Sequence, residues 1–398
     1  MKYDNPQIGE WNDIIIGNEI EIIPGFAFSS KLFNNKKKGL PLIRIRDLDK
    51  KDTECYYDGP YNEEFIVNKG DLLIGMDGEF NVYIWKGGKA LLNQRVCKIS
   101  PRNPGAFDKM FLYYSLQNPL KIRESQIGQT TVKHLSRDDF YKIKYPIPKS
   151  NEERKAIAII FLAIDKCLEK INEEINTLEN IKIGFKNHFF KEKINQHSLG
   201  NVSYINENLI DPRKSPNTPF TYVDIESVKN GGSGEIVNPK ILLGKTAPSR
   251  ARRLIKSNDL IMSTVRPYLK AIAIIPEKLD NQVCSTGFGV ITPHEDMDSS
   301  YIFYSLLSED VMLQCKKMMS GGQYPAINES QLKKILINKP SKDIQIKIST
   351  ILFNLNKKQL IKKEKILRFE RIKKGLMNDL LTGKRRVNVE NVLKIGKS

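Results

Sequence analysis

The stretch RIKKGLMNDLLTGKRRV (371–387) closes the last long helical pattern of this 398-residue chain. A looser version, NIKIGFKNHFFKEKI, stands at residues 180–194. Both place Ile-Lys, one further residue and then Gly at positions 191 residues apart, beginning at Ile181 and Ile372. Because self-similarity at a fixed offset marks a repeated structural unit, the sequence predicts two halves that each end in the same long helix.

Shorter segments upstream of these helices also recur in the same order. Their patterns predict a strand that runs into a turn, a β-branched strand that ends in Pro, and a short apolar helix. Asp71 and Asp259 hold the same place in the two strand-to-turn segments, where a carboxylate is expected to cap a turn. The recurring pairs are KGDLLIGMDGEFN (69–81) with SNDLIMSTVRPYLK (257–270), QRVCKISP (94–101) with FGVITP (288–293), and MFLYYSL (110–116) with YIFYSLL (301–307).

The two long helical patterns share an apolar seam whose positions step by four and three residues, as the a and d positions of a coiled coil do. Polar residues interrupt the seam in the second copy, and a helix over residues 152–194 would be roughly 64 Å long. Such a helix needs a partner helix to cover its seam. If the two helices pack antiparallel, the two globular units lie at opposite ends of the rod. The predicted pairing and docking positions are Ile157, Phe161, Ile164, Leu168, Ile171, Ile175, Leu178, Phe185, Ile348, Leu352, Leu355, Ile366, Phe369 and Leu376.

The predicted fold class is α/β: two globular α/β domains joined by two long antiparallel coiled-coil helices, as a pseudo-two-fold tandem repeat. The predicted boundaries are 1–148 and 195–340 for the two globular domains, 149–194 for the central helix, and 341–398 for the C-terminal helix and tail. A rigid spacer between two basic domains suits an extended polymer of regular pitch such as duplex DNA.

The formal net charge of +18 and the pI of about 9.4 favour a polyanionic partner. A lysine-rich protein from an A+T-biased genome is the alternative reading of this charge. The five cysteines form no CxxC pair and the four histidines lie far apart, so neither a disulfide framework nor a metal-ligand cluster is expected. The N-terminus lacks a signal-peptide pattern and the longest apolar run, AIAIIFLAI (156–164), is too short for a membrane span. The chain is therefore expected to be intracellular and cytoplasmic.

Motifs for catalysis are weak. GGSGEIVNPK (231–240) has glycines without the GK[ST] ending of a P-loop. NTPF (217–220) departs from the Asp/Asn-Pro-Pro-aromatic motif of amino-methyltransferases, and no glycine-rich cofactor motif accompanies it. His134 and His294 read as ordinary loop residues. The chain is therefore predicted to bind without catalysing, and no cofactor is expected on it.

Basic and amide side chains are the better candidates for binding. PSRARRLIK (248–256) clusters three arginines before a predicted strand, and Arg44 and Arg46 are expected on one face of a short strand. Guanidinium and ammonium groups neutralise phosphates, Arg reads guanine bidentately, and a Gln beside a loop glycine could read adenine. The predicted DNA-binding residues are Lys36, Lys37, Lys38, Arg44, Arg46, Gln129, Lys133, Arg250, Arg252, Arg253, Arg266, Lys270, Gln323 and Tyr324.

Across almost its whole length the sequence resembles the specificity subunits of type I restriction–modification systems. The order of the matching segments, the duplicated layout and the two long helices together carry this resemblance. The segments are GFAFSSKLF (25–33), PLIRIRDL (41–48), GDLLIGMDGEFN (70–81), SRARRLIK (249–256), STVRP (263–267) and GLMNDLLTGKRRV (375–387).

The resemblance implies two target recognition domains, each reading one half of a split, asymmetric DNA sequence. It implies that the two helices set the spacer and dock two methyltransferase subunits, and that two ATP-dependent translocase–nuclease subunits complete the complex. S-adenosylmethionine, ATP and Mg would then belong to the partner subunits. The TGKRR ending (382–386) follows only the second helix, so the two docking sites need not be equivalent.

Two other classes of protein stay open at this point. An enzyme with a fused recognition module would methylate or cleave DNA without partners. A basic coiled-coil scaffold with non-specific nucleic-acid binding would show no preference for one split sequence.

Overall fold

The computed structural model describes residues 10–105, 107–127, 133–319 and 325–395. They form two compact units: unit 1 runs to Ile171 and resumes at Lys365, and unit 2 is the intervening Asn172–Glu364. The sequence-based boundaries treat the two long helices as separate segments. In the structure each unit instead contains half of each long helix.

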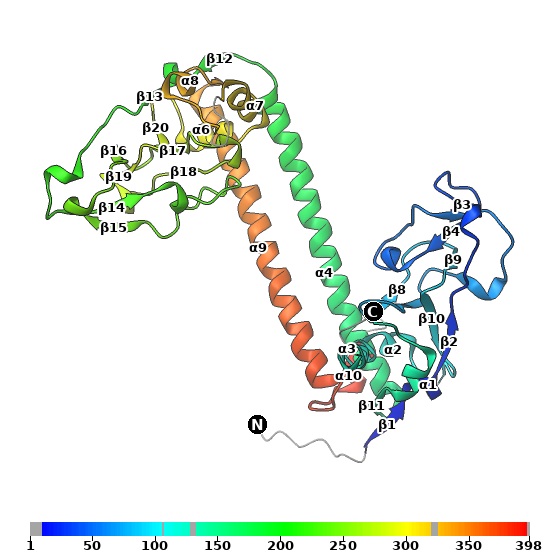
Figure 1. Cartoon of the computed structure of the whole chain (residues 1–398). Coiled ribbons are helices and arrows are strands. Elements are labelled where there is room, and N and C mark those ends of the chain that lie inside the picture. The colour runs from blue at the N-terminus through cyan, green and yellow to red at the C-terminus, as the bar shows by residue number, and fades with distance from the viewer. Residues whose placement is uncertain (1–9, 106, 128–132, 320–324, 396–398) are drawn as a thin grey trace. The chain divides into compact units, whose positions relative to one another are not determined.

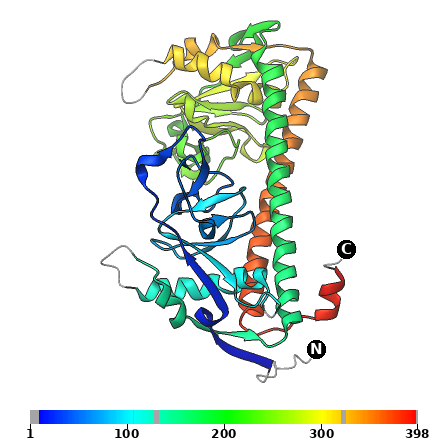
Figure 2. The same cartoon turned by 90° about the vertical axis from the view of Figure 1, so that its right-hand side faces the viewer.

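The two long helices are α4 (Asn151–Lys186) and α9 (Lys342–Leu380). In unit 1 the C-terminal half of α9 lies beside the N-terminal half of α4, seen as the orange-red helix behind the long green one in Figure 2. In unit 2 the N-terminal half of α9 lies beside the C-terminal half of α4 (Figure 1). Within each unit, partners further along α4 meet residues earlier in α9, so the helix pair is antiparallel, as predicted.

Unit 1 is built on the antiparallel sheet β2-β10-β7-β8, with a second sheet, β3-β5-β4-β9-β6, and the pair β1-β11. Its strands are β1 Trp11–Ile15, β2 Ile20–Pro24, β3 Phe33–Asn34, β4 Leu40–Ile43, β5 Tyr56–Tyr57, β6 Ile66–Val67, β7 Leu72–Gly75, β8 Val82–Ile84, β9 Ala90–Leu92, β10 Val96–Pro101 and β11 Lys144–Pro148. Its other helices are α1 Ile16–Glu19, α2 Lys109–Ser115, α3 Gln117–Gln126 and α10 Val389–Ile395.

Unit 2 has three sheets of matching kind: β13-β20-β17-β18, β15-β14-β19-β16 and β12-β21. Its strands are β12 Gln196–Ser198, β13 Ser203–Ile205, β14 Pro219–Val223, β15 Lys240–Leu243, β16 Ala251–Ile255, β17 Leu260–Ser263, β18 Ile272–Ile274, β19 Gln282–Ser285, β20 Phe288–Pro293 and β21 Leu336–Asn338. Its other helices are α5 Leu199–Val202, α6 Ser299–Leu306, α7 Glu309–Met318 and α8 Glu329–Lys333.

Equivalent strands confirm the tandem repeat predicted from the sequence. β10 lies between β2 and β7, and β20 lies between β13 and β17 in the same order. The second sheet of each unit contains one parallel pair, β4 with β9 and β14 with β19. The predicted strand-to-turn segments are β7 and β17, and the predicted apolar helices are α2 and α6.

The central sheet of each unit is buried on both faces, because successive residues of a strand point to opposite sides. In β7, Leu72 and Ile74 enter the core that α2 and α4 cover, while Leu73 faces a second core with Trp85. In β17, Leu260 and Met262 join the helix-covered core and Ile261 the opposite one. This alternation inside fully apolar strands explains why both strands read as continuous hydrophobic runs.

Asp71 and Asp259 cap the turns before β7 and β17, as the sequence predicts. The Asp71 carboxylate accepts from the backbone amide of Asn68 at 2.9 Å, and Asp259 accepts from Lys256 at 2.8 Å. Asp259 also accepts from the Thr292 hydroxyl at 2.7 Å. Burial raises the pKa of Asp259, which is 3% exposed.

The central helix ends earlier than the predicted residue 194. After Lys186 a π-helical turn (Asn187–Lys191) places Phe190 in the core of unit 2, with its ring centroid 5.7 Å from that of Tyr301. The side-chain amide of Asn338 then donates to the carbonyls of Phe189 and Glu192 at 2.9 and 2.7 Å. Tertiary packing of an aromatic side chain thus ends the helix before the sequence pattern does.

Candidate nucleic-acid interface

Lys36, Lys37 and Lys38 lie on the exposed loop between β3 and β4, as predicted. The loop is shaped by Asn34, whose side-chain oxygen accepts from the amides of Lys36 and Lys38 at 3.0 and 3.1 Å. Lys37 takes a left-handed backbone conformation at φ 58°. Three exposed ammonium groups are therefore presented on a defined turn.

Arg44 and Arg46 do not share a strand face, which corrects the sequence-based expectation. β4 ends at Ile43, and Arg44 precedes a 3₁₀ turn (Ile45–Asp47) that turns Arg46 outward to solvent. The chain leaves the strand because the buried Asp47 carboxylate accepts from the Arg44 amide at 3.1 Å and from its Nε at 3.2 Å. Arg46 is the freer guanidinium for binding an anion.

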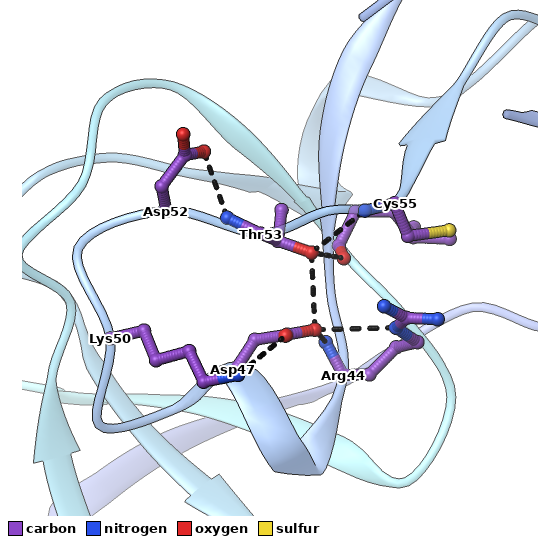
Figure 3. A network of polar contacts seen from close by, with 7 residues as sticks. Arg44, Asp47, Lys50, Asp52, Thr53 and Cys55 are labelled. Carbon is purple, nitrogen blue, oxygen red and sulfur yellow. Dashed lines mark hydrogen bonds and ion pairs between the residues drawn. The ribbon is translucent and has the colours of Figure 1, made fainter. Parts of the chain in front are cut away.

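The carboxylate of Asp47 is the centre of the polar network drawn in Figure 3. It accepts from the Thr53 hydroxyl at 3.1 Å and lies 3.9 Å from the Lys50 ammonium. The Thr53 hydroxyl in turn accepts from the amide of Cys55 at 3.2 Å. The Thr53 hydroxyl also lies 3.2 Å from the carbonyl of Leu42 in β4, so the network ties the loop that carries Arg44 to the end of the strand.

Unit 2 has an equivalent turn with the side chains exchanged. Asp224 precedes the 3₁₀ turn Ile225–Ser227, and its carboxylate accepts from the amide and hydroxyl of Ser227 at 3.0 and 2.8 Å. Lys240 of the neighbouring strand β15 completes the pair as an ion partner of Asp224. The turn is kept in both units, while the residues that make its polar contacts differ.

The arginine cluster of unit 2 lies differently from its prediction. Arg252 and Arg253 lie within strand β16 rather than before it, and only Arg250 lies ahead of the strand, where it is exposed. Arg252 forms an ion pair with Asp211, and Arg253 donates to the backbone carbonyl of Phe288. Burial lowers the pKa of Arg253. Arg250 is therefore the most accessible member of the cluster.

Arg266 and Lys270 flank the 3₁₀ turn Pro267–Leu269, and both adopt left-handed backbone conformations, at φ 48° and 57°. In unit 1, Lys133 forms an ion pair with Glu124 at 3.0 Å. Gln129, Gln323 and Tyr324 lie outside the described residues. All of the predicted DNA contacts stay predictions.

One polar cluster was missed by sequence reasoning. Asp77, in the turn after β7, lies 2.7 Å from Nδ1 of His134 and 3.1 Å from Nη1 of Arg95. Arg95 is itself left-handed, at φ 71°, and its side chain is 58% exposed. Three separate segments meet here, so no local pattern could have indicated it. His134 is a loop residue whose ring nitrogen is hydrogen-bonded to Asp77.

The predicted seam positions are distributed between the two unit cores. Ile157, Phe161 and Ile164 are buried in the core of unit 1, and Ile348 and Leu352 in that of unit 2. Ile171 is also buried. The remaining seam positions, which are partly buried, are Leu168, Ile175, Leu178, Phe185, Leu355, Ile366, Phe369 and Leu376.

Polar residues that interrupt the seam pair across the helices. Lys373 lies 2.5 Å from Asp165 in unit 1, and Lys362 lies 2.5 Å from Glu174 in unit 2. Gln359, 7% exposed, accepts from Lys182 at 2.9 Å and donates to Glu179 at 2.7 Å. Polar pairs at such positions fix the register of two helices, which explains why the apolar pattern is broken there.

Among the described residues, no group of three His, Cys, Asp or Glu side chains is placed to hold a metal ion. No helix within those residues is long and apolar enough to cross a membrane. All five cysteines are free thiols, and burial raises the pKa of Cys97 and Cys284 to about 12. Thiols protonated in this way are poor nucleophiles.

The sequence matches the protein-family model described as the type I restriction modification DNA specificity domain, over residues 9–180 and 192–371. The chain belongs to this family. The match falls once in each half, in agreement with the duplicated strands and helices described above.

Two curated relatives are both named as type I restriction enzyme specificity subunits. That of EcoBI from Escherichia coli is 40% identical over 43% of this chain and 35% of the relative. That of MjaVIII from Methanocaldococcus jannaschii is 28% identical over 82% of this chain and 81% of the relative. The matched part of this chain thus spans about a third of the length of the EcoBI subunit and most of the length of the MjaVIII subunit.

A solved structure shows that the fold extends over the whole chain. The S subunit of a type I restriction–modification system from M. genitalium covers 96% of this chain and 97% of its own, with a TM-score of 0.59. At 16% sequence identity, this likeness concerns the fold alone.

Proposed function

We propose that this specificity-domain chain is the DNA sequence-recognition subunit of a type I restriction–modification complex. Each unit would read one half of a bipartite, asymmetric site. The observation that supports this most is the repeat itself: one fold occurs twice, and the residues at equivalent turns differ between the copies (Arg44 and Asp47 against Asp224 and Ser227). Two copies of one fold with different residues suit two different half-sites.

The helix pair would set the distance between half-sites and dock two methyltransferase subunits. Exposed apolar side chains on α9 support the docking role, because large side chains on a solvent-facing helix mark an interaction surface. They are Ile344, Ile346, Ile351, Phe353, Leu360, Ile361, Leu367 and Ile372.

The chain would contribute recognition and no catalysis. Adenine methylation with S-adenosylmethionine, and ATP- and Mg-dependent translocation and cleavage by two further subunits, would belong to its partners in the cytoplasm. Net charge +18 supports a duplex DNA partner, since phosphate neutralisation supplies sequence-independent affinity.

The test is to co-express the chain with its candidate methyltransferase and map methylated adenines by single-molecule sequencing. One interrupted motif, methylated once on each strand, is the expected result and yields both half-sites and the spacer. Methylation by the purified chain alone would identify an enzyme with a fused recognition module instead. An assembled complex that methylates nothing would leave a basic scaffold as the better account.

A further inference from the structure

Unit 2 contains a pocket of about 1030 Å³ that the predicted DNA contacts do not explain. It lies between the helix pair and the globular part of the same unit, and Gly231, Gly232 and Gly234 form part of its wall. Five lysines line it. One of them, Lys182, is paired with Glu179 at 2.9 Å, and the one glutamate of the lining, Glu235, is paired with Lys229. The lysines are Lys182 and Lys186 of α4, Lys270, and Lys357 and Lys363 of α9.

Lys186 is the unusual member of this set. It is half-buried and forms no ion pair with the described residues. Burial lowers the pKa of Lys186, the nearby charges of Lys182 and Lys270 lower it further, and the carboxylates of Glu179 and Glu309 only partly oppose this. Converging like charges at a partly buried place are unfavourable unless an anion completes the site.

Lys270 is held in place by its backbone. Its left-handed conformation, φ 57°, is uncommon for a residue with a side chain, and its carbonyl accepts from the amide of Gly232 at 3.0 Å. Gly232 lies close to Leu307 at the C-terminal end of α6: a Cβ on Gly232 would lie 2.5 Å from the Leu307 side chain. The loop of Gly231, Gly232 and Gly234 thus fixes the backbone of Lys270 beside the pocket. The Nζ of Lys270 donates to the Leu307 carbonyl at 3.3 Å.

The repeat provides an internal comparison. At the offset of 191 the counterpart of Lys186 is Met377, which packs against the core of unit 1. Strands β8 and β18 are equivalent in the two units. The residue two places before β18 is Lys270, and the residue two places before β8 is Phe80, which is fully buried. Unit 2 therefore carries two ammonium groups where the same fold in unit 1 carries two apolar side chains.

We propose that this pocket binds a backbone phosphate of duplex DNA and anchors one strand beside the helix pair of unit 2. This inference rests on the proposed function, because DNA is the polyanion that such a subunit meets. The contact is independent of base sequence, since lysines act as point charges. It adds Lys182 and Lys186 to the interface predicted from sequence.

A phosphate fits these lysines better than an acidic segment of a partner protein. The ammonium groups come from α4, from α9 and from the turn before β18, so positive charge lines the pocket on three elements. A phosphate diester offers charged oxygens that several ammonium donors can share. An acidic protein partner is accordingly an outcome that the experiment must detect.

The experiment compares Lys186→Met with the wild-type chain, each in its methyltransferase complex, on a fluorescent duplex without the target site. Met stands at the equivalent place of unit 1, so the variant is expected to fold with an unfolding midpoint no lower than wild type. We expect the slope of log affinity against log salt to fall by about 0.9, the contribution of one phosphate contact. Lys347→Met, which removes an exposed lysine of α9 outside the pocket, is the matched control and should leave the slope unchanged.

The other outcomes separate the inference from the proposed function. If the DNA affinity of the wild type depends on salt and Lys186→Met has the same slope, the pocket does not bind a DNA phosphate. The proposed DNA recognition is then unaffected. A wild type without salt-dependent DNA binding overturns both. Saturable binding of inorganic pyrophosphate, lost in Lys186→Met while the DNA slope stays the same, would assign a soluble phosphate ligand instead. Loss of methyltransferase from the purified variant, again with an unchanged slope, would assign an acidic partner.

Discussion

The guanidinium of Arg386 donates two hydrogen bonds to the carboxylate of Glu153, Nε to Oε1 at 2.5 Å and Nη2 to Oε2 at 2.6 Å. Glu153 is in the first turn of α4 and is 2% exposed, and Arg386 also pairs with Glu10. The TGKRR segment after α9 therefore closes the helix pair of unit 1. Unit 2 closes its own pair through the Asn338 side chain, which explains why TGKRR has no copy after α4.

Replacing Arg386 with Met should destabilise unit 1 by about 2 kcal/mol, because it leaves the buried Glu153 carboxylate without its charged donor. This is less than for a fully buried pair, since the Arg386 side chain is 31% exposed and solvent screens the pair. Both tryptophans, Trp11 and Trp85, lie in unit 1, so denaturant unfolding followed by their fluorescence reports on this unit. Arg385→Met, at an exposed neighbour, should be near neutral; equal losses for the two variants would contradict the buried-pair account.

A charge at Leu168 should disrupt both helix packing and half-site spacing. Leu168 packs against the core of unit 1 together with Phe369 and Leu376. Leu168→Asp is expected to lower the unfolding free energy of unit 1 by about 2–3 kcal/mol, from burial of an unpartnered carboxylate. Methylated-adenine mapping of the complex should then show weakened or altered spacing. Cys167→Asp, exposed on the same helix, is the control; unchanged stability and spacing in Leu168→Asp would refute the role of the helices as a ruler.

The carboxyl group of Asp139 should protect unit 1 against acid. Burial alone would raise its pKa, but hydrogen bonds from Ser136 and the Arg123 guanidinium outweigh it and bring the pKa to about 2. Since the folded pKa lies below the unfolded one, the stabilisation is present above about pH 4 and is lost as the pH falls toward about 2. The difference in unfolding free energy between wild type and Asp139→Asn should shrink over that range. A difference that stayed constant with pH would exclude ionised Asp139 as its source.

Arg250 and Arg253 should separate binding from stability. Arg250 is exposed ahead of β16, so Arg250→Ala should weaken DNA binding and leave thermal unfolding unchanged. Arg253→Ala removes the donor to the Phe288 carbonyl and should cost about 1–3 kcal/mol of stability, with any loss of DNA affinity following from it. Circular dichroism and fluorescence anisotropy on both variants check this. A stable Arg253→Ala protein with lost affinity would restore Arg253 as the direct contact expected from sequence.

The sequence by itself determined the repeat, because offset and order survive in a one-dimensional pattern. It determined the α/β class, the two long helices with a pairing seam and the turn-capping roles of Asp71 and Asp259, because strand alternation and heptad spacing are local periodicities. The charged lysine loop before β4 also followed from local composition.

Only the tertiary structure decided what depends on residues distant in sequence. Phe190 ends the central helix because its ring packs against Tyr301, which no helical pattern contains. The Arg253 side chain donates to the carbonyl of Phe288, 35 residues along the chain, and so is not free at the surface. The charge of Lys270, on the other side of the pocket, lowers the pKa of Lys186. The charge of a side chain is written in the sequence, but its burial and its partners depend on packing, and these decide whether the charge holds the fold or remains free for a ligand.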